Sequence, residues 1–118
     1  MSTQQNASTS PDFRTMGAGL AERLGALRRD LHRIPELGFD LPRTKARLLQ
    51  EFAGMPVEIH EFDGWSAFVV VVRGGGPGPV VLVRGDMDAL PVAEESGEDF
   101  AATNGAMHAC GHDMHMSA

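Results

Sequence analysis

The sequence predicts an α/β sandwich in which two helices precede the strands of a mostly parallel central sheet. Apolar residues recur at helical spacing in the first half of the chain, and two continuous runs rich in β-branched residues follow them. A glycine-rich turn at residues 74–78 separates the two runs. The chain has 118 residues, so it is either one small domain or part of a larger one.

Two amphipathic helices are expected in the first half of the chain. The first has one apolar face, whose members follow one another at helical steps: Leu20, Leu24, Leu27 and Leu31. Ile34 precedes Pro35 and therefore avoids the helical conformation, which ends this helix. The second helix is expected over residues 41–53, with Asp40 capping its first turn and Gly54 at its end.

Strands are expected after residue 56. Val57 and Ile59 alternate with polar residues, as in a half-buried strand. Residues 67–72 and 80–83 form continuous apolar runs, which suit central strands buried on both faces. A further helix is expected to begin near Asp113, and no helix-stop signal follows it. The chain is therefore expected to be the truncated N-terminal part of a longer domain.

Composition excludes several classes of protein. The formal net charge of −6 disfavours nucleic acid as a partner, and no stretch approaches the ~20 apolar residues of a membrane span. Cys110 is the one cysteine, which excludes an intrachain disulfide and fits a reducing compartment. Residues 1–15 are polar, lack the pattern of a signal peptide and are interpreted as a disordered leader before a folded part at 16–118. We expect a cytoplasmic protein without a nucleic-acid or membrane partner.

A dense group of metal-binding residue types stands near the end of the chain. His108, Cys110 and His112 alternate, so an extended segment places them on one side, and Asp113 and His115 follow. Thiolate and imidazole are good ligands for zinc and other transition metals. The chain has no C-x-x-C pair, which argues against a structural zinc finger. The group is more typical of an open catalytic site that takes further ligands from elsewhere in the fold.

Two carboxylates follow the second apolar run. Asp86 and Asp88 are two residues apart, so in an extended chain they point the same way. Such a pair can hold a metal ion or orient a metal-ligating histidine, and the alternative is an ordinary solvated turn. His32 and Glu36 flank Ile34 and Pro35 and are interpreted as a structural cluster at a helix end. Trp65 is interpreted as a packing residue.

Three motifs in order carry a family resemblance. They are LHRIPELGF (31–39), RGDMDALP (84–91) and MHACGHD (107–113). Together they resemble the amidohydrolase branch of the aminoacylase and carboxypeptidase G-type metallopeptidases. This branch includes hippurate hydrolases, N-acyl-amino-acid amidohydrolases and the auxin-conjugate hydrolases of plants. The resemblance covers residues 20–118 and implies the N-terminal part of a catalytic α/β domain.

The resemblance also implies roles for individual residues. Cys110 and His112 match metal ligands, and Asp88 matches the catalytic-site acid that orients a ligand. Asp86, His108 and Asp113 are expected to contact these residues and to orient them, without binding the metal themselves. The implied cofactor is one or two divalent ions of Mn, Zn, Co or Ni. The implied reaction is hydrolysis of the amide bond in hippurate-like N-acyl amino acids, by a parent protein that is a homo-oligomer.

The family's general-base glutamate, its remaining ligands and its dimerisation domain lie downstream of the cysteine motif, beyond Ala118. The 118 residues are therefore expected to be an incomplete and inactive piece of such an enzyme. Two alternatives stay open. One is a hydrolase that uses Cys110 as its nucleophile, and the other is a truncated product without catalytic activity.

Overall fold

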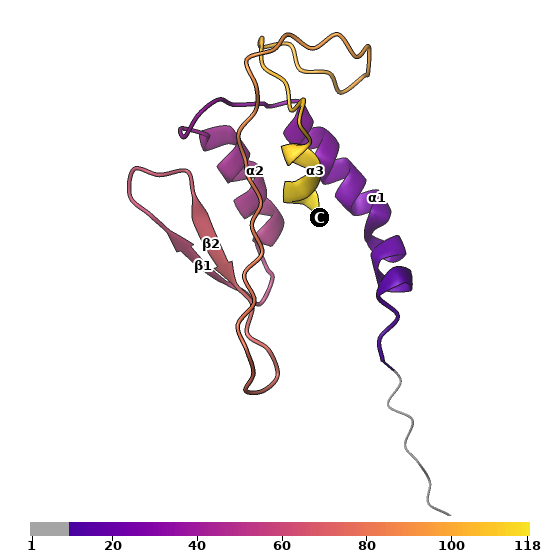
Figure 1. Ribbon diagram of the computed structural model, residues 1–118, viewed down its shortest axis with the longest axis vertical. Helices are drawn as coiled ribbons and strands as arrows, with labels where there is room; N and C mark the ends of the chain where they lie inside the picture. Colours follow the sequence, from indigo (N-terminus) through magenta and orange to yellow (C-terminus); the bar gives the residue numbers. More distant parts are fainter. Residues whose placement is uncertain (1–9) are drawn as a thin grey trace, which may run out of the picture.

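The computed structural model describes residues 10–118 and has a mixed α/β architecture (Figure 1). Along the chain lie α1 (Phe13–His32), α2 (Pro42–Phe52), β1 (Glu58–Glu61), β2 (Phe68–Val71) and α3 (His112–Ser117). In Figure 1, α3 lies between α1 and α2, and the two strands lie on the far side of α2. The α/β class expected from the sequence is confirmed, as is the short helix that begins beside Asp113.

Helix α1 begins earlier than the sequence pattern predicted. Asp12 is its cap, and the Asp12 carboxylate accepts hydrogen bonds from the backbone N–H groups of Arg14 and Thr15. The interpretation of residues 1–15 as a leader is therefore wrong for residues 13–15, and residues 1–9 lie outside the described part. The helix ends at His32, before the predicted stop at Ile34 and Pro35.

Helix α2 is capped by a residue other than the expected one. Leu41, and not Asp40, occupies the cap position, and a leucine side chain offers no hydrogen-bond acceptor. The Glu36 carboxylate takes over this function, because it accepts from the backbone N–H groups of Arg43 at 3.2 Å and Thr44 at 2.7 Å. Glu36 also accepts the N–H of Ala89 through its own carbonyl oxygen at 2.8 Å. It therefore ties α2 to the segment that carries Asp88.

Replacing Glu36 by alanine is expected to lower the free energy of unfolding by about 0.5–2 kcal/mol, the usual cost of losing a helix cap. The loss leaves two N–H groups at the start of α2 without their partner. Urea denaturation followed by circular dichroism measures the change. Glu36→Gln is the matched control, because it keeps one acceptor oxygen and should lose less. Equal losses in the two variants would contradict the capping role.

The small core lies where α1, α2 and α3 meet. Leu27 and Leu31 of α1 and Leu48 of α2 are buried, and Phe68, Met87 and Met116 pack against them. Of the four leucines predicted to share one face of α1, Leu20 remains 47% exposed. The pattern therefore identified the correct face, but α3 and α2 cover only its C-terminal half.

The sheet differs from the prediction. Strands β1 and β2 pair antiparallel, from Glu58 opposite Val71 to Glu61 opposite Phe68, so the described residues form no parallel sheet. The predicted central strand at 80–83 does not form, and its side chains are 80–97% exposed. These four residues share no backbone–backbone hydrogen bond with any other described residue. A strand needs a neighbouring strand for its backbone groups, and an apolar run cannot supply one by itself.

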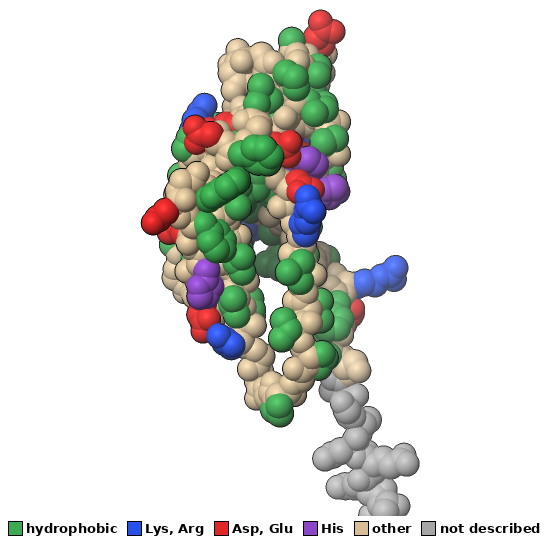
Figure 2. Space-filling model, turned by 60° about the vertical axis from the view of Figure 1, so that its left-hand side comes forward, with side chains coloured by type: hydrophobic (Ala, Val, Ile, Leu, Met, Phe, Trp, Pro, Cys, Tyr) green, Lys and Arg blue, Asp and Glu red, His purple; other side chains and the backbone are tan. Residues whose placement is uncertain are grey.

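The surface of the described residues is rich in apolar side chains. Figure 2 shows them spread over one face and mixed with a few charged groups. None of the helices within residues 10–118 has the length and apolarity that crossing a membrane would require.

Candidate functional site

The second and third sequence motifs come together through a short antiparallel bridge. Leu90 and Met107 exchange two backbone hydrogen bonds, at 2.9 Å and 3.0 Å. The bridge sets the segment that contains Asp88 against the segment that leads to Cys110 and His112. Two motifs that are about twenty residues apart in the sequence thus become neighbours.

His112 is fixed on Asp88. Its ring atom Nδ1 lies 2.8 Å from the backbone carbonyl oxygen of Asp88 and 3.1 Å from Oδ1 of the Asp88 carboxylate. A carbonyl oxygen can only accept, so Nδ1 must carry the hydrogen. In the neutral ring the free lone pair then lies on Nε2. Metal-ligating histidines are commonly held in this way, with one nitrogen donating to an oxygen and the other facing the ion.

Cys110 and His112 stand on either side of a sharp backbone turn. Gly111 has φ = +95°, a left-handed conformation that glycine adopts at little cost, and it forms the cap of α3. His112 is the first residue of the helix, and the thiol of Cys110 is free and exposed. An exposed thiol beside an oriented imidazole offers one sulfur and one nitrogen donor, the donor types that zinc-like ions prefer.

A buried ionic network lies behind His112. Asp113 is fully buried, and its Oδ2 accepts from Nε of Arg28 at 2.7 Å and from Nδ1 of His32 at 2.8 Å. The other ring nitrogen of His32 lies 2.8 Å from the Glu94 carboxylate. Ionised carboxylates only accept, so a ring that satisfies both of them donates from both nitrogens as an imidazolium. His32 thus links α1 to α3 and to the loop that follows Asp88.

The network holds its carboxylates in the charged form. Burial opposes ionisation of Glu94, but hydrogen bonds from Ser96, the N–H of Ala102 and His32 outweigh it and lower its pKa from 4.5 to about 2. Burial likewise opposes ionisation of Asp113, and the hydrogen bonds from His32 and Arg28 lower its pKa below the usual range. Both groups therefore carry a negative charge at neutral pH.

His108 is buried, and neither of its ring nitrogens has a hydrogen-bond partner in the described structure. Burial lowers the pKa of the His108 imidazole, so the ring is neutral. It packs beside His32, with 6.4 Å between the two ring centroids. The alternation of His108, Cys110 and His112 therefore does not put all three on one exposed side, because His108 points into the interior.

Asp86 forms an ion pair with the side chain of Arg84. Nε and Nη2 of Arg84 donate to its Oδ1 at 3.0 Å and 2.8 Å, and this hydrogen bonding lowers the pKa of Asp86. Asp86 and Asp88 nevertheless line the same cavity, of about 300 Å³, together with Phe39 and Trp65. These two rings meet edge to face at 6.4 Å, and Trp65 is 59% exposed. Trp65 is therefore at most half-packed, contrary to its interpretation as a packing residue.

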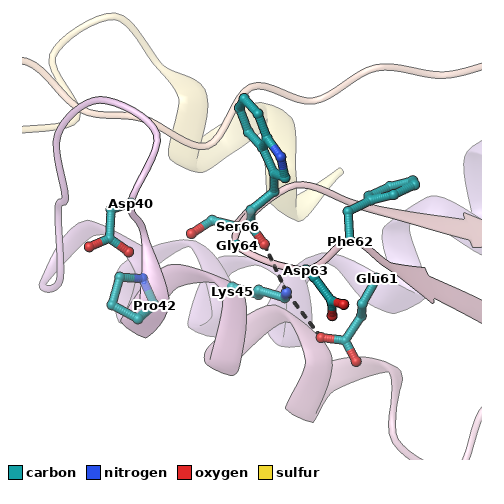
Figure 3. Close-up of a pocket in the computed structure, with 9 residues that line it drawn as sticks. Asp40, Pro42, Lys45, Glu61, Phe62, Asp63, Gly64 and Ser66 are labelled. Atoms are coloured by element: carbon teal, nitrogen blue, oxygen red, sulfur yellow. Dashed lines mark hydrogen bonds and ion pairs between the residues drawn. The ribbon is translucent and has the colours of Figure 1, made fainter.

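A second cavity, of about 470 Å³, lies between the start of α2 and the turn after β1 (Figure 3), and it shares Trp65 and Ser66 with the first cavity. Lys45 projects into it and is already paired with Glu61 at 3.0 Å and with the carbonyl oxygen of Trp65 at 3.2 Å. No residue singled out as a site residue lines this cavity, so it is not part of the candidate site.

The sequence-predicted residues thus divide into two groups. Asp88 and His112 meet, and Cys110 lies two residues before His112 in the chain, whereas Asp113 and His108 belong to the buried interior. Within residues 10–118 no three His, Cys, Asp or Glu side chains converge as a complete metal site would require. Sequence reasoning missed the linking role of His32 and all of Glu94. His32 belongs to the first motif, which could have marked it as a site residue. Nothing in the sequence around Glu94 distinguished this buried acid from exposed ones.

Known proteins resemble this chain in sequence and in fold. Residues 82–118 match the model of peptidase family M20/M25/M40. The N-acetyldiaminopimelate deacetylase of Listeria innocua is 47% identical over 94 residues, which are 78% of this chain and 25% of that protein. The same enzyme of Bacillus velezensis is 47% identical over 98 residues, 81% of this chain and 26% of that protein. The chain thus spans about a quarter of the length of these relatives.

A solved structure shows the same fold. The YxeP protein of Bacillus subtilis, a dinuclear metal binding peptidase from the M20 family, matches with a TM-score of 0.77 and 35% identity. The match covers 85% of this chain and 28% of that one. Both of the later motifs, with Asp88, Cys110 and His112, fall within the stretch that the family model matches. Over the residues that these matches cover, the chain therefore belongs to peptidase family M20/M25/M40.

Proposed function

We propose that this chain supplies part of the divalent-metal site of an amidohydrolase that cleaves N-acyl amino acids. The contact of His112 Nδ1 with Asp88 carries the proposal, because it leaves Nε2 free to bind a cation. Cys110 would supply the second donor, as a thiolate, from the other side of Gly111. A divalent ion held by Cys110 and His112 would supply Lewis-acid chemistry, polarising an amide carbonyl and lowering the pKa of water to ~7.

The names of the relatives narrow the acyl group that we propose. The sequence motifs suggested hippurate-like substrates, whereas the relatives at 47% identity are N-acetyldiaminopimelate deacetylases. We therefore propose an acetyl group on an amino acid as the substrate class. The cavity of about 300 Å³ that Asp88 shares with Phe39 and Trp65 supports a small substrate, since Asp88, the partner of His112, is one of its lining residues.

A cysteine-nucleophile mechanism receives no comparable support. A nucleophilic thiol needs a base within hydrogen-bond reach, and within residues 10–118 no histidine forms a hydrogen bond with Cys110. Two histidines are equally near along the chain: His112 directs Nδ1 to Asp88, and His108 is buried whereas Cys110 is exposed. The metal-dependent reaction is therefore the function that the geometry favours.

Titration of the chain with Co²⁺ tests the proposed metal site. We expect weak binding with a thiolate-to-cobalt charge-transfer band, because two donors hold an ion loosely. Cys110→Ser should abolish the band, and His112→Ala should weaken the affinity by about tenfold or more. His60→Ala is the matched control, since His60 lies exposed on β1. A band that survives in Cys110→Ser would contradict the assignment.

The substrate half of the proposal needs a protein of full relative length. The matching segment of the Listeria innocua deacetylase can be replaced by residues of this chain. We expect this chimera to release acetate from N-acetyldiaminopimelate and to lose that activity with His112→Ala. A chimera that binds metal and folds, but hydrolyses only benzoylated amino acids, would contradict the acetyl assignment and leave the metal site standing.

A further inference from the structure

The buried network and the proposed metal site are joined by one peptide bond. Asp113 is held from α1 by Arg28 at 2.7 Å and by His32 at 2.8 Å. His112, directly before it, is held on the other side by Asp88. The six-residue helix α3 therefore has its first turn clamped between α1 and the segment that contains Asp88.

The clamp fixes the rotation of α3 about its own axis. Consecutive residues of an α-helix point about 100° apart, so fixing the direction of Asp113 also fixes that of His112. Asp113 is fully buried and its carboxylate has no freedom to follow a rotated helix. On another side the backbone of His115 and Met116 passes near Gly85, 3.8 Å from the position that a Cβ there would take, so α3 also lies against the segment that leads to Asp88.

We propose that His32 is a positioning residue for the metal site, acting through Asp113 on the orientation of His112. Its Nδ1 contact with Asp113 fixes α3 in the rotation in which Nδ1 of His112 meets Asp88 and Nε2 of His112 is left for a cation. The Nε2 contact of His32 with Glu94 has a different task, because it holds the loop after Asp88 against α1. The two ring nitrogens of one residue thus serve two separable purposes.

This inference rests on the proposed metal site, but its central readout does not need a metal. The readout is the tautomer of His112 in the metal-free chain, observed by NMR on the protein with ¹⁵N-labelled histidine. At mildly alkaline pH the neutral form of the His112 ring should carry its proton on Nδ1, the nitrogen that meets Asp88. Failure of the chain to bind Co²⁺ would remove the proposed function and would leave this measurement intact.

Two variants of His32 separate its two contacts. The amide nitrogen of asparagine lies as many bonds from Cα as Nδ1 of histidine, and that of glutamine lies as many as Nε2. His32→Asn therefore keeps a donor for Asp113 and loses Glu94, whereas His32→Gln keeps a donor for Glu94 and loses Asp113. Both variants remove the positive charge, so each is the matched control of the other.

We expect His32→Gln to abolish the Nδ1–H signature of His112 and to lower the Co²⁺ affinity by about tenfold. His32→Asn should keep the signature and bind Co²⁺ within about twofold of the original chain. Urea midpoints should fall by similar amounts in the two variants, since each loses one bond to a buried carboxylate. If the role of His32 were purely structural, the Nδ1–H signature of His112 would weaken in proportion to the fall in urea midpoint. An equal loss of this signature in both variants would therefore overturn the proposal.

A second route to the same carboxylate covers the case in which His32→Gln does not fold. Arg28 also donates to Asp113, and its side chain is 31% exposed, so its replacement is milder. Arg28→Gln should disturb the His112 signature in the same direction as His32→Gln. A His112 signal that stays unchanged in Arg28→Gln, in a chain where His32→Gln is unfolded, would overturn the proposal as well.

Discussion

Replacing His32 by alanine is expected to lower the free energy of unfolding by about 3–5 kcal/mol, the usual cost of breaking a buried ion pair from one side. His32 is 3% exposed and stands between two carboxylates whose side chains are each 1% exposed. Alanine removes both hydrogen bonds and leaves Glu94 without its cation and Asp113 with Arg28 alone. The cost arises from the stranded charges more than from the lost contact itself.

Urea denaturation of the chain at neutral pH measures this loss. His60→Ala is the matched control, because the side chain of His60 is 58% exposed and meets its nearest carboxylate at 3.7 Å. Its change should stay within about 0.5 kcal/mol. A loss of less than about 1 kcal/mol in His32→Ala would show that water compensates the two carboxylates, and the description of the network as a buried link would then be wrong.

Acid is expected to unfold the chain mainly through the same network. The pKa of Glu94 is about 2 in the folded state, against an ordinary value of 4.5. Below pH 4.5 Glu94 binds a proton in the unfolded chain but stays ionised in the folded one. The contribution of Glu94 to the free energy of unfolding is therefore fully present above this pH and is lost as the pH falls toward 2. The difference corresponds to roughly 3 kcal/mol, and the lowered pKa of Asp113 acts in the same direction.

A series of urea midpoints between pH 6 and pH 2 measures this dependence. Glu94→Gln should make the curve flatter by about one proton, because a neutral amide cannot titrate. Glu95→Gln is the neighbouring control and should leave the slope unchanged, since Glu95 is exposed. Parallel curves for Glu94→Gln and the original chain would mean that Glu94 ionises in the folded state as it does in water.

The sequence was most informative where a local pattern has one structural solution. The leucine spacing identified α1, and the proline after Ile34 placed its end within two residues. Gly111 and the histidines around it predicted a turn followed by the helix that the structure shows. Asp88 was singled out as an acid that orients a histidine, and the structure places it in contact with Nδ1 of His112, while the metal-binding role of this pair stays a prediction.

The sequence was least informative where long-range partners decide the outcome. Residues 80–83 have the composition of a central strand, yet they remain exposed, because no described strand lies where their backbone groups can bond. Likewise Asp40 had the right chemistry to cap α2, but the carboxylate of Glu36, in the loop between α1 and α2, binds the free N–H groups instead. Local propensity describes which secondary structure a segment prefers, and the segments that pack against it determine whether that structure forms.

The amino-acid sequence alone determined the helices of the first half, the family and the choice of Cys110 and His112 as candidate ligands, because these depend on spacing and residue type within short segments. Tertiary structure alone decided that His32, Glu94 and Asp113 share one buried network. Along the chain, His32 is 81 positions from Asp113 and 62 positions from Glu94. It also decided that His108 is interior while His112 faces Asp88. Alternation along a chain fixes relative direction, but burial depends on which other segments pack on each side.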